Sequence, residues 1–118
     1  MWIFTETGFI SAVRTAPGSA DLKVRSRDRL SLEPLASMTG AEIVKSPHGD
    51  YPYRVFITAE QLGQFLAWSV DGLEYDNFKS QVYATRGYDF AHALSGVWSI
   101  MHDVEDADAR STTSSSEG

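Results

Sequence analysis

The chain has 118 residues, a formal net charge of −6 and no cysteine. Its length suits one domain with a single apolar core and is too short for two. The absence of cysteine excludes disulfides, thiolate nucleophiles and cysteine-based zinc sites, and it fits the reducing conditions of the cytoplasm, where we expect the protein to act.

The N-terminal third of the chain predicts three strands. Residues 2–5 and 9–15 are apolar stretches on either side of a glycine-containing connection of hairpin length. Residues 22–27 alternate apolar or small side chains with cations, which is the pattern of a half-buried strand. A short helix over 32–38 is expected next, because Ser31 has N-cap chemistry and a proline falls in the first turn.

The middle of the chain predicts a hairpin followed by a helix. Strands over 42–45 and 53–58 enclose a segment rich in turn-forming residues. Thr58 and the glutamine three residues later match a capping box, and apolar residues recur at helical spacing from there to Leu73. A shorter helix near 77–83 follows.

The C-terminal part predicts one more helix and then a tail. The helix starts at Asp89, a candidate cap, and its apolar stripe reaches Met101. Residues 103–118 carry five acids and one arginine, a net charge of −4, which leaves −2 for residues 1–102. We expect one α+β domain over 1–102 and a disordered, acidic, Ser/Thr-rich tail over 103–118. No apolar run approaches the roughly 18 residues of a membrane helix, and the start lacks the features of a signal peptide, so no membrane contact is expected.

The order of these elements predicts a ferredoxin-like fold. The strand over 22–27, a helix, two hairpin strands and a second helix match the first five elements of a β-α-β-β-α-β unit. Residues 9–15 take the place of the missing last strand in this interpretation. The result is a permuted, four-stranded antiparallel sheet with helices packed on one face.

Side-chain alternation in this sheet predicts a cationic surface. The residues expected to face the helices are Leu22, Val24, Tyr53, Val55 and Ile57, and those expected to face away are Arg14, Lys23, Arg25, Arg27, Arg54 and Phe56. Cations neutralise phosphates and an aromatic ring stacks on bases, so this surface is a candidate for binding RNA or DNA. Two alternatives stay open: the cations only keep the sheet hydrated, pairing with acids such as Glu42, or the face contacts a protein.

Two further places are candidate contact sites. Stacking, donor and acceptor groups that suit a polar ligand or a peptide are combined in Tyr75, Asp76, Asn77 and Lys79. Capping of the following helix by Asp76 or Asn77 explains the same pattern. Trp68 lies off the apolar stripe of its predicted helix, which favours contact with a partner or a second copy, whereas core packing is expected for Trp2 and Trp98.

No motif in the sequence supports catalysis. The candidates for acid–base or metal chemistry are His48, His92 and His102. His48 precedes Gly49-Asp50 and suits a turn, and the other two histidines lie ten residues apart on separate parts of a predicted helix surface. The sequence has no glycine-rich phosphate loop, nucleophile elbow or acidic metal cluster, so neither a cofactor nor a metal is expected.

Four parts of the sequence carry a resemblance to known proteins: residues 1–5 with Gly8-Phe9, Tyr53-Arg54, residues 75–79 and residues 97–101. Their pattern is similar to that of a family of small bacterial and phage proteins of uncharacterised function. The resemblance spans most of residues 1–102. It implies one intact domain with an added tail, and it implies no activity, cofactor or catalytic residue.

The sequence leaves three functional hypotheses. The first is a non-enzymatic binding or adaptor protein that contacts a protein partner, or a second copy in a homodimer, through its sheet face or through Trp68. The second is an RNA- or DNA-binding protein that uses the basic sheet face. The third is a small enzyme of unknown chemistry.

Overall fold

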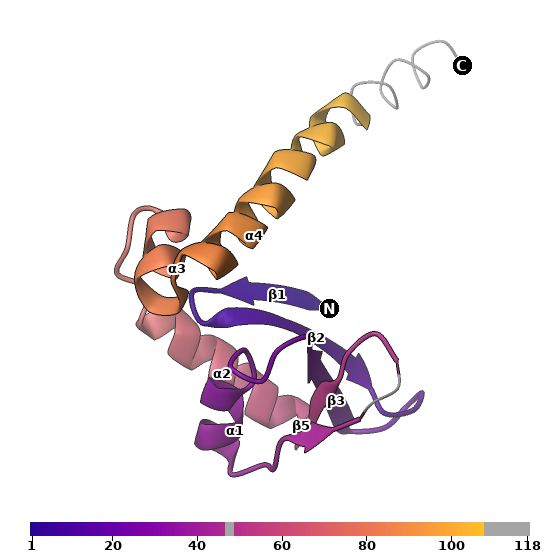
Figure 1. Ribbon diagram of the computed structural model, residues 1–118. Coiled ribbons are helices and arrows are strands. Elements are labelled where there is room, and N and C mark those ends of the chain that lie inside the picture. The colour runs from indigo at the N-terminus through magenta and orange to yellow at the C-terminus, as the bar shows by residue number, and fades with distance from the viewer. Residues whose placement is uncertain (47–48, 108–118) are drawn as a thin grey trace, which may run out of the picture. The chain divides into compact units, whose positions relative to one another are not determined.

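The computed structural model describes residues 1–46 and 49–107. These residues form an α+β protein with an open antiparallel sheet of five strands and with four helices (Figure 1). They fall into two compact units, one over Met1–Phe78 and one that begins at Lys79, and each is described by itself. None of the helices in the described ranges combines the length and the apolar character that crossing a bilayer requires.

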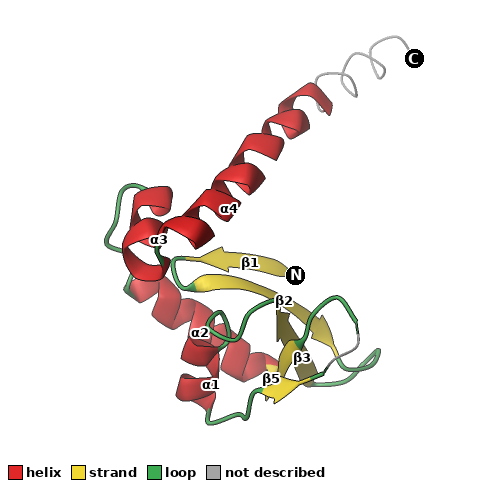
Figure 2. Cartoon of the chain, in the orientation of Figure 1, coloured by secondary structure: helices red, strands yellow, loops and turns green. Residues whose placement is uncertain are grey.

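The first unit holds the whole sheet, drawn in yellow in Figure 2, and two helices. In chain order its elements are β1 (Trp2–Thr5), β2 (Gly8–Arg14), β3 (Asp21–Ser26), α1 (Glu33–Thr39), β4 (Val44–Lys45), β5 (Tyr53–Thr58) and α2 (Ala59–Asp71). The strand order is β1-β2-β3-β5-β4, and every pairing is antiparallel. The sheet has one strand more than the predicted four, because β1 pairs along β2 and extends the edge.

The strand registers confirm the predicted alternation in β3 and β5. Leu22 lies opposite Ile57 and Val24 lies opposite Val55. The buried core combines sheet residues with residues from both helices: Ile10, Ala12, Leu22, Val24, Val55, Ile57, Leu35, Leu62 and Phe65. The two helices therefore cover the same face of the sheet, as predicted (Figure 1).

A capping box starts α2 where the sequence predicts it. The Gln61 N–H donates to Thr58 Oγ1 (3.1 Å), and the Thr58 N–H donates to Gln61 Oε1 (2.9 Å). These two bonds satisfy backbone and side-chain groups that a helix end otherwise leaves to water. The chain can therefore turn from β5 into α2 without a linker.

Replacing Thr58 by alanine is expected to lower the free energy of unfolding by about 1 kcal/mol, because the Gln61 N–H loses its acceptor. Chemical denaturation of the full chain measures this change. Gln64→Ala, an exposed change in the same helix, is the control and should leave the free energy of unfolding within about 0.5 kcal/mol of the wild-type value. Equal stability of Thr58→Ala and the control would contradict the role given to the cap.

Ser31 joins β2 to the loop before α1 instead of capping that helix. Leu32 is the N-cap residue and makes no side-chain cap bond. The Ser31 hydroxyl donates to Asp28 Oδ1 (2.6 Å) and accepts from the Phe9 N–H (3.2 Å). Gly8 lies directly against Ser31 with a φ of 154°, and a Cβ at Gly8 would overlap the Ser31 side chain. The local N-cap signal at Ser31 is thus used for a contact between distant segments.

The second unit holds α3 (Phe78–Arg86) from its second residue onward, then α4 (Tyr88–Ile100) and a helical stretch over 102–107. Its buried apolar residues are Val82, Ala91 and Leu94. Gly87, with a φ of 90°, is the N-cap residue of α4, so the predicted cap Asp89 lies in the first helical turn instead. The start of the predicted tail at residue 103 falls within helix, and residues 108–118 lie outside the described residues.

Candidate binding surface on the sheet

The sheet face opposite α1 and α2, called the outer face from here on, carries aromatic and cationic side chains. Residues directly opposite each other on paired strands share a face, so the registers assign its members. In chain order they include Trp2, Phe4, Phe9, Ser11, Val13, Lys23, Arg25, Val44, Arg54 and Phe56. Trp2 is 70% exposed and Phe56 is 52% exposed, so both rings are accessible to a ligand.

Tyr51, two residues before β5, contacts three arginines at this face. The Cζ atoms of Arg25 and Arg27 lie 4.5 Å and 4.9 Å from the centroid of its ring. Arg54 Nη2 donates to the Tyr51 carbonyl oxygen (3.1 Å). The Tyr51 side chain is buried, and its ring lies 6.5 Å from that of Phe9. Cation–π contacts of this kind restrict the positions of the guanidinium groups.

The aromatic rings continue from Phe9 to the β1 edge. Phe4 stacks on Phe9 with 4.5 Å between the centroids and 17° between the planes, and Trp2 meets Phe9 edge-on at 5.5 Å. These rings and Tyr51 are not among the residues predicted for the surface. The available signal was the alternation of Trp2 and Phe4 around Ile3, which assigns both rings to one side of β1.

The four cations at this surface, Lys23, Arg25, Arg27 and Arg54, form no ion pair within the described ranges. A pairing with Glu42, which one of the alternatives invoked, is absent from these ranges. Arg25 Nη2 donates to Ser11 Oγ (2.9 Å), and Arg27 Nη1 donates to the Asp50 carbonyl oxygen (3.2 Å).

Arg25 and Arg54 lie directly opposite each other on β3 and β5. The Nε atom of each is buried without a hydrogen-bond partner among the described residues. Like charges on opposed residues repel, and an unpaired buried donor costs free energy. An anion bound beside the two guanidinium groups would reduce their mutual repulsion.

Arg14 does not belong to the outer face, and its predicted place there is wrong. Its register partner is Leu22, a core residue, so Arg14 shares the helix-covered side at the exposed end of β2. Its Nη1 donates to the Ser19 carbonyl oxygen (2.9 Å). In β2 the odd-numbered residues, beginning at Phe9, face outward. Arg14 has an even number, so its side chain lies on the opposite face from the one predicted.

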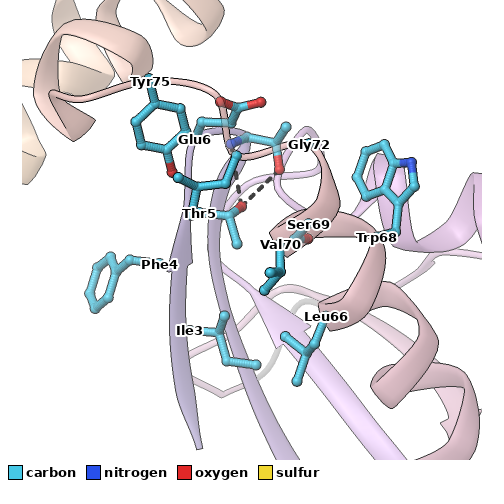
Figure 3. Close-up of a pocket in the computed structure, with 12 residues that line it drawn as sticks. Ile3, Phe4, Thr5, Glu6, Leu66, Trp68, Ser69, Val70, Gly72 and Tyr75 are labelled. Atoms are coloured by element: carbon cyan, nitrogen blue, oxygen red, sulfur yellow. Dashed lines mark hydrogen bonds between the residues drawn. The ribbon is translucent and has the colours of Figure 1, made fainter.

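Trp68 and Tyr75 line a cavity of about 420 Å³ beside β1 and the end of α2 (Figure 3). Trp68 is 51% exposed, and the nearby Val70 and Leu73 are exposed as well, so the predicted apolar stripe of α2 is not buried at its C-terminal end. Glu6 supplies one carboxylate oxygen that is buried and has no hydrogen-bond partner in the described part of the chain. The cavity therefore offers apolar walls with one anionic acceptor.

The candidates of segment 75–79 are divided between the two units. Tyr75 packs near Phe78 with 6.1 Å between the ring centroids, while Asp76 and Asn77 are exposed. Lys79 belongs to the second unit, where its Nζ lies 4.2 Å from the centroid of the Trp98 ring.

The histidines are not assembled for catalysis or metal binding in the described part of the chain. His48 lies outside the described residues. His92 stacks on Tyr88, and His102 meets the edge of Trp98. No group of three His, Asp or Glu side chains in the described ranges could hold a metal ion.

The core packing predicted for Trp2 and Trp98 is wrong, because Trp98 is 56% exposed and Trp2 is more exposed still.

Comparison with protein-family models, curated proteins and solved structures finds no match to this chain.

Proposed function

We propose that this chain is a non-enzymatic binding protein whose outer face binds single-stranded nucleic acid. The observation that supports it is a group of four cations that share a sheet surface with exposed aromatic rings. These cations have no carboxylate partners in the described ranges. They are four of the ten lysines and arginines of a chain whose net charge is −6. Such a local concentration of positive charge attracts a polyanion despite the acidic overall balance.

The exposed rings favour a single strand over a duplex. Trp2 and Phe56 present aromatic surface on an open sheet, and Phe4 is partly exposed beside Phe9. Bases in a duplex are stacked on one another, whereas the bases of a single strand can be splayed onto aromatic side chains. The guanidinium groups held at Tyr51 would then contact the phosphates between stacked bases.

A permuted ferredoxin-like topology is part of the same proposal. The strand order β2-β3-β5-β4 supports it, since β3, α1, β4, β5 and α2 follow the order of the first five elements. β2 then occupies the position of the last strand, beside β3. In this arrangement the helices cover one face and the other is left for a ligand.

A salt titration tests the proposed function. Binding of fluorescent single-stranded RNA and DNA to the full chain is followed by anisotropy between about 50 and 200 mM salt. Four phosphate contacts predict a slope of about −3 in log K against log salt, or about a 50-fold loss of affinity over this range, because each contact on a single strand contributes about −0.7. Absence of binding at the lowest salt, or affinity that does not change with salt, would contradict the proposal.

A further inference from the structure

The C-terminal end of α4 and the helical stretch after it expose a line of apolar side chains, called the α4 stripe from here on. It consists of Val97, Ile100, Met101 and Val104. At 100° per residue these four positions span an arc of about 100°, so they lie along one side of the helix. Their exposed fractions are 37%, 65%, 55% and 51%. An apolar surface this continuous on a helix is typical of a contact site.

The α4 stripe begins beside the buried residue Leu94 of α4 and extends beyond the reach of α3. Leu94, which lies on the same side of the helix as Val97, is buried. Tyr83 of α3 contacts Tyr88 at the start of α4, and Lys79 near the start of α3 contacts Trp98. Since α3 has nine residues, it spans only about 13 Å. The stripe therefore extends beyond the first turn of α3.

Carboxylates flank the α4 stripe on both sides. Asp103 and Glu105 are both exposed. At 100° per residue around the helix axis, Asp103 lies about 60° beyond Ile100 at one margin of the stripe, and Glu105 lies about 40° beyond Met101 at the other. Between Arg86 and Arg110 the sequence contains no lysine or arginine. In paired helices the charges beside the apolar seam select the partner, so this pattern has a defined complement.

We infer that the α4 stripe docks an amphipathic helix of a partner protein whose apolar seam is flanked by lysine or arginine. Such a helix covers the exposed aliphatic side chains and places cations beside Asp103 and Glu105. A second copy of this chain fits less well, because it would bring carboxylates towards carboxylates. The inference does not depend on nucleic-acid binding by the outer face, which belongs to the other unit.

The test uses three labelled synthetic peptides and the full chain. The first is an amphipathic helix of leucine and lysine, the second carries glutamate in place of each lysine, and the third has the composition of the first with its leucines scattered around the helix. Anisotropy is measured near physiological salt. The first peptide is expected to bind at least about tenfold more tightly than either of the others, because only it matches both the seam and the flanking charge.

Variants locate the contact. Ile100→Gln combined with Val104→Gln should weaken the leucine–lysine peptide at least tenfold, and Asp103→Asn combined with Glu105→Gln should weaken it about threefold. The control, Leu30→Gln with Met38→Gln, changes exposed apolar residues of the first unit and should have no effect. Circular dichroism checks that the helix content of each variant equals that of the wild type. If Ile100→Gln combined with Val104→Gln reduces the helix content, the peptide titration is carried out with Val104→Gln alone.

Two results would overturn the inference. One is equal binding of the peptide to the wild type and to a folded stripe variant. The other is a dimer of the chain, seen by light scattering and abolished by the stripe variant, since the occupant would then be a second copy.

Discussion

Replacing Gly8 by alanine is expected to destabilise the protein by about 3 kcal/mol. The new Cβ would overlap the buried side chain of Ser31, and the φ of 154° at this position disfavours any residue with a Cβ. Ser31 cannot move freely, because its hydroxyl bonds both Asp28 and the Phe9 N–H. Urea denaturation of the full chain, followed by circular dichroism, measures the change.

Gly63→Ala is the matched control for this substitution. Gly63 lies in the interior of α2 with a helical backbone, and a Cβ there meets no atom within 4 Å. Alanine should therefore stabilise the protein by about 0.5 to 1 kcal/mol through its higher helix propensity. If both substitutions change stability by the same amount, close packing of Gly8 on Ser31 is not what requires glycine.

Reversing two charges on the outer face is expected to reduce affinity for single-stranded nucleic acid about 100-fold near 100 mM salt. The variant is Lys23→Glu with Arg54→Glu, which removes two cations from β3 and β5 and adds two repulsive charges. Salt-dependent anisotropy measures the affinity, and the slope against log salt should fall to about half its wild-type value.

A second double variant has the same net charge and serves as the control. Arg14→Glu with Arg29→Glu changes one arginine on the helix-covered side of the sheet and one that pairs with Glu33 at 3.6 Å. Affinity should stay within about threefold of the wild type, because only long-range attraction is altered. Equal losses in the two variants would show that net charge governs binding and would remove the outer face as the specific site.

The elements that sequence analysis identified are those with strong local signals. The alternation around Leu22 and Val24 fixes which side chains of β3 meet the helices, since a shift of one residue would bury the cations. The capping box at Thr58 identifies Ala59 as the first residue of α2. In both cases the sequence signal lies within a few positions along the chain.

The parts that were missed depend on contacts between distant positions. Tyr51 is separated from Arg25 and Arg27 by more than twenty residues and becomes part of the surface only when β5 pairs with β3. The orientation of Arg14 depends on the register of β2, which its own sequence does not reveal. For Trp98 the helical period was correct, but periodicity does not say how far a neighbouring helix extends.

Under the proposed function, the opposed pair Arg25 and Arg54 would couple ligand occupancy to the folding equilibrium. The repulsion between these guanidinium groups is present in the free native state and is relieved when the chain unfolds or when a polyanion screens them. A ligand that binds only the folded form adds stability in proportion to the logarithm of its concentration. In a cell, the lifetime of this protein would then rise and fall with the supply of its ligand.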